Sequence, residues 1–194
     1  MNKISGKIIN HDGSYTGTIE FSDKIESINK DKHSDFENII IPGFIDLHCH
    51  GGNGFDTMGG FSSIIEMSKH HLKQGTTTLL PTTLTATLED TTKALEGLND
   101  FIDQNNNLTN ILGVHLEGPF INPNKLGAQP PHAQLPNIDF INKIKEQAII
   151  KVITLAPELE GSENFIDYLI KNNIKVQIGH SLADYNCCMK IMNK

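Results

Sequence analysis

The sequence predicts an α/β fold in which a parallel sheet covered by helices follows a short all-β region. One observation favours the parallel sheet, and a second limits its type. From residue 39 onwards, apolar runs alternate five times with helical patterns, as expected for successive βα units. No glycine-rich phosphate-binding turn follows the first apolar run, which argues against a dinucleotide-binding fold. An open doubly wound sheet and part of a (β/α)₈ barrel both fit this pattern.

The first 41 residues differ from the rest of the chain. Residues 3–10, 16–21 and 24–29 alternate between apolar and polar side chains, with a turn signal at residues 12–13. Three short strands rarely bury enough apolar surface to be stable alone. We therefore expect residues 1–41 to form an incomplete all-β unit.

The five apolar runs of the longer region are the predicted strands. The first run is almost continuously apolar, which predicts a strand buried on both faces. Polar N-cap residues predict where the helices begin. The expected strands cover residues 39–47, 76–81, 111–116, 149–155 and 174–178. The expected helices begin at Ser63, Thr87, Asn137, Ser162 and Asp184, and the second of them includes Phe101 and Ile102.

The composition argues against several classes of protein. A net charge of -7 gives no electrostatic reason to bind nucleic acid or an anionic membrane. No apolar run approaches the ~18 residues of a membrane-spanning helix, and the N-terminus has no signal-peptide pattern. We therefore expect a cytoplasmic protein without nucleic-acid or membrane partners. Its three cysteines are expected to be reduced thiols.

Polar residues at the ends of three predicted strands form the candidate functional site. Asp46, His48 and His50 share one face of the first strand, because side chains alternate along a strand. Glu117 ends the third strand and His180 follows the fifth. Each histidine alone is readily explained as a packing or surface residue. In a barrel, however, these strand ends converge on one mouth, so His48, His50, Glu117 and His180 would meet there.

The residue types favour a divalent metal. A carboxylate at a buried strand end needs a cation or several donors, and the chain has no arginine. Imidazole with carboxylate suits Zn²⁺ and also Fe²⁺, Mn²⁺ or Co²⁺, and the sequence does not choose among them. Asp46 would hydrogen-bond a ligand imidazole. His115, on the same face as Glu117, is expected to be a packed or substrate-side residue and not a ligand.

Several segments resemble known proteins. The segment Pro42-Gly43-Phe44-Ile45-Asp46-x-His48-x-His50-Gly51 resembles the first barrel strand of the amidohydrolase superfamily. Other segments resemble, in order, the N-acetylglucosamine-6-phosphate deacetylases. These segments are Gly75-Thr76-Thr77-Thr78, Pro81-Thr82, His115-Leu116-Glu117-Gly118-Pro119-Phe120, Gly127-Ala128-Gln129-Pro130, Leu155-Ala156-Pro157-Glu158 and Gly179-His180-Ser181.

The resemblance implies both architecture and site. Residues 1–41 would contribute to a small β-sandwich domain, and residues 42–194 would form the first five βα units of a truncated (β/α)₈ TIM-like barrel. The activity implied is metal-dependent hydrolysis of N-acetylglucosamine 6-phosphate to acetate and glucosamine 6-phosphate. The residues that the resemblance assigns are Glu117 and His180 as metal ligands, His48 with His50 as the pair of members that hold two metals, and Ala128 with Gln129 as substrate contacts.

Members of that family continue for about as long again. The resemblance therefore places barrel strands six to eight, a further histidine ligand, an arginine and the aspartate acid/base beyond residue 194. We expect an incomplete enzyme that acts with a complementing C-terminal half, and association with a second copy is the other partner expected. The alternatives are a non-catalytic fragment and another amidohydrolase, such as a cyclic amidase. A cyclic amidase would share His48 and His50 but has no reason to share residues 115–120 with 127–129.

Overall fold

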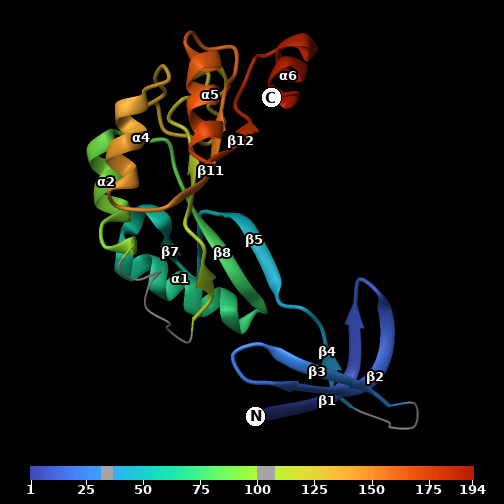
Figure 1. Ribbon diagram of the computed structural model, residues 1–194. Helices are drawn as coiled ribbons and strands as arrows, with labels where there is room; N and C mark the ends of the chain where they lie inside the picture. Colours follow the sequence, from blue (N-terminus) through green and yellow to red (C-terminus); the bar gives the residue numbers. More distant parts are fainter. Residues whose placement is uncertain (32–36, 100–107) are drawn as a thin grey trace. The chain divides into compact units, whose positions relative to one another are not determined.

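The computed structural model describes residues 1–31, 37–99 and 108–194, and the chain divides into two compact units, residues 1–43 and 44–194 (Figure 1). Within the described residues the first unit is one four-stranded sheet in the order β3-β2-β1-β4. Strand β1 runs antiparallel to β2, which pairs with β3, and parallel to β4. The bounds are β1 Asn2–Asn10, β2 Gly13–Phe21, β3 Ile25–Lys30 and β4 Ile39–Ile40. The expected all-β region is present, and its completion to a β-sandwich stays a prediction.

The second unit is a curved parallel half-barrel. Its main strands follow the order β12-β11-β10-β8-β5, and β9 also pairs with β8. This spatial order is the order of the strands in the sequence, whereas a doubly wound sheet reverses direction at a switch point. The bounds are β5 Phe44–Cys49, β8 Thr76–Thr83, β9 Asn110–Ile111, β10 Val114–Glu117, β11 Ile150–Leu155 and β12 Lys175–Ile178. The predicted barrel type is therefore confirmed over five strands.

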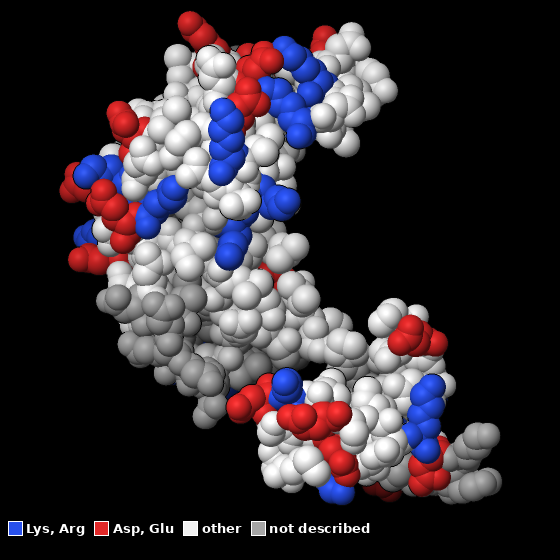
Figure 2. All heavy atoms as spheres, viewed as in Figure 1, with Lys and Arg blue, Asp and Glu red and all other residues white. Residues whose placement is uncertain are grey.

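Helices cover one face of this half-barrel (Figure 1), and charged side chains gather over those helices (Figure 2). Their inner stripes and the strands form an apolar core in which Phe120 contacts Phe140 and Phe165 edge to face. The helices are α1 Phe61–Lys73, α2 Leu88–Leu95, α4 Ile138–Lys145, α5 Ser162–Lys171 and α6 Tyr185–Met192. Short elements in the loops are β6 Gly51–Gly52, β7 Phe55–Asp56, η1 Thr57–Gly59 and η2 Pro123–Lys125. None of the helices in the described ranges could span a membrane.

Three of the five predicted helix starts are confirmed. The side chains of Thr87, Asn137 and Asp184 each accept the backbone N–H of the residue three positions later. Such caps satisfy donors that the first turn of a helix leaves free. The predicted extension of the second helix to Phe101 and Ile102 lies outside the described residues.

The caps predicted at Ser63 and Ser162 are wrong. Both serines lie inside the first turn of their helices, and a glycine occupies each cap position. The hydroxyl of Ser63 accepts the backbone N–H of Asp56, and that of Ser162 donates to the carbonyl of Ala156. Each serine therefore ties its helix to the preceding loop. A serine with this role has the same sequence pattern as a cap.

The prediction that the first barrel strand is buried on both faces is also wrong. Phe44, Ile45 and Leu47 of β5 are 49% to 65% exposed. Strand β5 ends the strand order of the half-barrel and pairs only with β8 among the described residues. A run of apolar residues records hydrophobicity, but it does not record the position of a strand within its sheet.

Candidate metal centre

Two histidines at the end of β5 face the carboxylate that ends β10. The Nε2 atoms of His48 and His50 lie 3.1 Å apart. Nε2 of His50 lies 2.8 Å from Oε2 of Glu117, and Nε2 of His48 lies 3.6 Å from the same oxygen. One ligand atom from each of the three residues lies within 4.8 Å of the other two. This spacing suits a single divalent ion among them.

A third imidazole approaches the other oxygen of the carboxylate. His180 follows β12, and its Nε2 lies 3.0 Å from Oε1 of Glu117. The structure therefore brings together the four side chains that were predicted to converge, from three strand ends. The carboxylate presents Oε2 to His48 and His50, and Oε1 to His180. Such a carboxylate could hold one ion or bridge two.

Backbone carbonyls fix the orientation of two of these imidazoles. Nδ1 of His50 lies 3.1 Å from the carbonyl oxygen of Thr82, and Nδ1 of His180 lies 2.9 Å from that of Lys125. Because a carbonyl oxygen only accepts, each Nδ1 carries the proton and the neutral ring has its lone pair on Nε2. Each lone pair then faces an oxygen of Glu117, and two acceptors at this distance need a proton or a cation between them. The donor set therefore fits a divalent metal.

Glu117 is buried and surrounded by donors. Burial would raise the pKa of its carboxyl, but hydrogen bonds from His50 and His180 and the charges of nearby imidazoles lower it to about 2. The hydrogen bond to Glu117 in turn raises the pKa of His50. Without a metal, the carboxylate therefore stays ionised and favours the protonated form of His50.

Gln129 belongs to the same cluster. Its Nε2 donates to Oε2 of Glu117 at 2.6 Å, and its Oε1 accepts the backbone N–H of Thr85 at 2.7 Å. The side chain is buried, whereas the neighbouring Ala128 is exposed in the loop after η2. The structure thus places Gln129 at the carboxylate and Ala128 on the adjoining loop surface. Their substrate contacts stay predictions.

Gly118 allows the chain to turn directly after Glu117. Its φ of +78° lies in the left-handed region, which L-residues with a Cβ rarely adopt. A Cβ at this position would also collide with Oγ1 of Thr85. That hydroxyl donates to the carbonyl oxygen of Glu117 at 3.2 Å. The glycine after the carboxylate therefore has a steric reason.

Asp46 does not make the predicted contact with a ligand imidazole. Its Oδ1 accepts the backbone N–H of His48 at 3.0 Å. The rings of His50 and His180 are oriented instead by main-chain carbonyls. A short aspartate side chain two residues from a backbone amide readily closes such a local turn, and the alternation of a strand does not reveal this competition.

His115 is a packed residue. It is fully buried, its Nδ1 lies 3.0 Å from the carbonyl oxygen of Leu47, and its Nε2 lies 2.7 Å from Oγ1 of Thr154. Burial lowers its pKa. Its ring meets that of His48 edge to face, with centroids 4.7 Å apart. His115 therefore packs against the ring of His48 and presents no free nitrogen to a metal.

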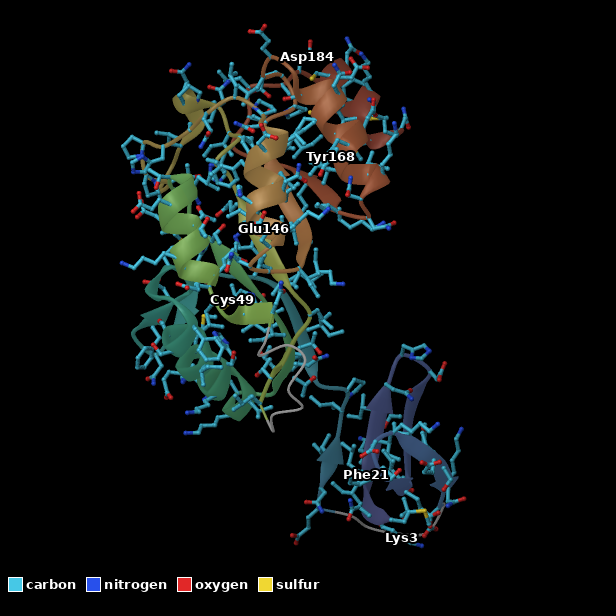
Figure 3. The ribbon with its side chains drawn as sticks, turned by 60° about the vertical axis from the view of Figure 1, so that its left-hand side comes forward. Lys3, Phe21, Cys49, Glu146, Tyr168 and Asp184 are labelled. Atoms are coloured by element: carbon cyan, nitrogen blue, oxygen red, sulfur yellow. The ribbon has the colours of Figure 1, made fainter. Side chains whose placement is uncertain are left out.

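Cys49, which is labelled in Figure 3, is the last residue of β5 and lies between His48 and His50 in the sequence. It is buried, and its Sγ lies 3.2 Å from Nε2 of His71 on α1. Burial raises the pKa of this thiol. Cys49 therefore anchors β5 to α1 and does not join the candidate metal ligands.

Sequence reasoning missed the groups that orient the candidate ligands. The carbonyls of Thr82 and Lys125 carry no residue-specific signal, because every residue has a carbonyl. Glu158 was recognised only as part of a family-like segment, yet its carboxylate contacts the loop that carries His180. The one available signal for it was a carboxylate three residues after a predicted strand, in a chain without arginine.

Comparison with known proteins shows the family. A profile of the amidohydrolase family matches residues 39–177. The chain belongs to this family. The match includes His48, His50 and Glu117.

Related proteins narrow the resemblance. The N-acetylglucosamine-6-phosphate deacetylase of Bacillus subtilis strain 168 is 35% identical over 166 residues, which are 82% of this chain and 42% of that protein. The N-acetylgalactosamine-6-phosphate deacetylase of Escherichia coli O157:H7 is 32% identical over 152 residues, which are 76% of this chain and 40% of that protein. The chain thus spans about two fifths of the length of these relatives.

Solved structures agree. The crystal structure of N-acetylglucosamine-6-phosphate deacetylase from Thermotoga maritima matches 99% of this chain and 52% of its own chain, with a TM-score of 0.87 and 34% identity. The deacetylase from Mycobacterium smegmatis gives a TM-score of 0.86 at 22% identity, a likeness of fold alone. The whole described chain therefore corresponds to about half of such an enzyme.

Proposed function

We propose that this chain provides the metal-binding half of an N-acetylhexosamine-6-phosphate deacetylase site. One observation carries the proposal: three imidazole Nε2 atoms surround the two oxygens of one buried carboxylate. The names of the relatives support the substrate class, which is an N-acetylated amino-sugar phosphate. The metal proposed is Zn²⁺ or Fe²⁺, with Mn²⁺ or Co²⁺ as the alternatives. A cytoplasmic location is part of the proposal.

The residues present would hold the metal in two groups. His48, His50 and Oε2 of Glu117 form one, and His180 with Oε1 of Glu117 forms the other. A bound divalent ion supplies Lewis-acid polarisation of the acetamide carbonyl and lowers the pKa of a water ligand. Ala128 and Gln129 would contact the sugar from the loop after η2.

The proton-transfer group is proposed to come from outside the 194 residues. Glu117 is the only carboxylate in the described cluster, and it serves as a ligand in this proposal. Deacetylation requires a group that takes a proton from the water and passes it to the leaving amine. The source would be a complementing polypeptide that corresponds to the remainder of the relatives, and association with a second copy is the other arrangement.

A second candidate function is metal binding without catalysis. The observation that favours it is that Glu117 is the only carboxylate in the described cluster and serves there as a ligand. Another amidohydrolase activity, such as cyclic amide hydrolysis, is the third candidate. It is disfavoured because the Bacillus subtilis and Escherichia coli relatives described above are both named as amino-sugar phosphate deacetylases.

The test is a deacetylation assay of the purified chain with N-acetylglucosamine 6-phosphate and N-acetylgalactosamine 6-phosphate, together with its metal content. We expect bound metal without turnover, and turnover after addition of a polypeptide corresponding to the other half of a relative. The His132→Ala variant should bind as much metal as the unmodified chain, because His132 is an exposed loop histidine outside the cluster. A chain that takes up none of Zn²⁺, Fe²⁺, Mn²⁺ and Co²⁺ would refute the proposal. Metal without turnover in the complemented sample would favour the non-catalytic candidate.

A further inference from the structure

The segment Leu155-Ala156-Pro157-Glu158 contains a carboxylate with no part in the candidate metal centre. Glu158 accepts three hydrogen bonds. The hydroxyl of Ser181 donates to Oε2 at 2.6 Å, the backbone N–H of Leu182 donates to Oε1 at 2.6 Å, and the side-chain amide of Asn122 donates to Oε1 at 2.9 Å. Both oxygens are therefore engaged, and all three donors are neutral groups.

These donors lie on two different loops. Ser181 and Leu182 directly follow His180, in the loop that leads to α6, whose N-cap Asp184 is labelled in Figure 3. Asn122 lies in the loop after β10, the strand that ends in Glu117. The carboxylate of Glu158 thus joins the loop of one candidate ligand to the loop that follows the other.

The backbone of His180 needs such support. Its φ of +50° lies in the left-handed region, which a residue with a Cβ adopts only at a cost in free energy. Its carbonyl accepts the backbone N–H of Asn122 at 2.9 Å, and its Nδ1 donates to the carbonyl of Lys125 at 2.9 Å. Asn122 therefore touches both the backbone of His180 and the side chain of Glu158. The two residues after His180 are held by Glu158 itself.

The hydrogen bonds around Glu158 favour the ionised form of its carboxylate. Burial would raise the pKa of its carboxyl, but hydrogen bonds from Ser181, Leu182 and Asn122 lower it. An ionised carboxylate accepts at both oxygens, whereas an amide at the same position accepts at only one. The oxygen of Ser181 already accepts the backbone N–H of Ala183 at 2.8 Å, so it is a poor partner for an added amide donor.

We propose that Glu158 is a positioning residue for His180. It fixes the loop after β12 so that Nε2 of His180 points at Oε1 of Glu117 while Nδ1 stays hydrogen-bonded to Lys125. Glu158 itself does not contact the metal. This inference rests on the proposed metal site, and it also makes a prediction for the metal-free protein.

The first measurement is Zn²⁺ affinity by competition with a chromophoric chelator. We expect Glu158→Ala to weaken binding by ~10-fold to 100-fold, the range seen when groups that orient metal ligands are removed, and Glu158→Gln to weaken it less. Glu160→Ala is the matched control, because Glu160 is an exposed carboxylate two residues away. In a His180→Ala background, Glu158→Ala should cause little further loss. An equal loss in both backgrounds, or no loss in the single variant, would overturn the proposal.

The second measurement needs no metal. The ¹⁵N shifts of His180 at pH 8 should report a proton on Nδ1 in the wild type and in Glu160→Ala, and averaged tautomers in Glu158→Ala. Circular dichroism checks that each variant is folded. If Glu158→Ala does not fold, Glu158→Gln takes its place in this measurement. An unchanged tautomer in a folded Glu158 variant would overturn the inference. A changed tautomer in a protein whose wild type binds no Zn²⁺ would support the positioning role and refute the metal site.

Discussion

The two carboxylate oxygens of Glu117 face histidines that are held by different kinds of structure, a strand end for Oε2 and a loop for Oε1. On the Oε2 side, His48 and His50 come from one strand end at the edge of the sheet, and their side chains are 44% and 37% exposed. On the Oε1 side, His180 comes from a loop, is 23% exposed and is held through Lys125, Asn122 and Glu158. Alternation along one strand end brings His48 and His50 together, and a carbonyl contact from Thr82 orients His50. The loop that carries His180 is held by several hydrogen bonds. Metal binding at the Oε1 side should therefore depend more on residues that are not themselves ligands, such as Asn122 and Glu158.

The largest effect should come from Glu117, which both sides share. Glu117→Ala should abolish Zn²⁺ uptake, because it removes the anionic ligand from both groups of candidate ligands. Inductively coupled plasma mass spectrometry of the purified variant checks the metal content. Glu146→Ala, which changes an exposed carboxylate on the outer helices, is the control. Equal metal content in wild type and Glu117→Ala would remove the basis for treating the two sides as one centre.

The next effect separates the two sides. His180→Ala should lower Zn²⁺ affinity at the Oε1 side while His48 and His50 still bind at the Oε2 side. A double His48→Ala, His50→Ala variant should show the reverse. Each should lose ~10-fold to 100-fold in affinity or one equivalent of metal. Titration with Co²⁺, followed by its absorption spectrum, distinguishes the two environments. Identical spectra for both variants would contradict the assignment of separate groups.

The pH dependence should differ between metal-free and metal-bound protein. The pKa of Glu117 is lowered from 4.5 to about 2, so its contribution to stability is present above pH 4.5 and is lost as pH falls towards 2. The pKa of His50 is raised from 6.5, so its contribution is present below pH 6.5 and is lost as pH rises through the raised value. Metal binding needs neutral imidazoles.

Zn²⁺ should therefore raise Tm more at pH 8 than at pH 5.5, where protons compete for Nε2. Differential scanning calorimetry with and without Zn²⁺ measures this difference, and EDTA should abolish it. A Zn²⁺-dependent rise in Tm that is constant from pH 5.5 to 8 would argue against imidazole ligation on either side.

The smallest effect concerns Gln129, which supports the Oε2 side. Gln129→Ala leaves the buried backbone N–H of Thr85 without its acceptor and removes a donor from Glu117. We expect a loss of ~1 to 3 kcal/mol in the free energy of unfolding, measured by urea denaturation. Gln74→Ala, at an exposed glutamine, is the control. A neutral outcome would show that the Oε2 side does not depend on Gln129.

Much of the fold could be predicted from sequence because its signals are local. Hydrophobic periodicity located the barrel strands, and side-chain caps located α2, α4 and α6. The convergence of His48, His50, Glu117 and His180 followed from the rule that parallel strand ends meet at one edge. Where a signal was ambiguous, as for the serines that begin α1 and α5, the wrong cap was chosen.

The rest depends on contacts between distant parts of the chain. The exposure of β5 follows from its place at the end of the strand order, which no single run of residues records. The carbonyls of Thr82 and Lys125 select the tautomers of the imidazoles, and a carbonyl has no sequence signature. The contact of Glu158 with Ser181 spans 23 positions, so the resemblance identified the segment but not its role.

The most direct test of the central claim is a crystal structure of this chain grown with Zn²⁺, with anomalous diffraction recorded at the zinc edge. The account predicts anomalous density beside Glu117, within ~2.0 to 2.2 Å of the carboxylate oxygens and of the histidine Nε2 atoms. Density at Oε1 and at Oε2 would show a bridging carboxylate, and density at one oxygen a single site. Zinc bound elsewhere, with the cluster unchanged and free of metal, would contradict the account.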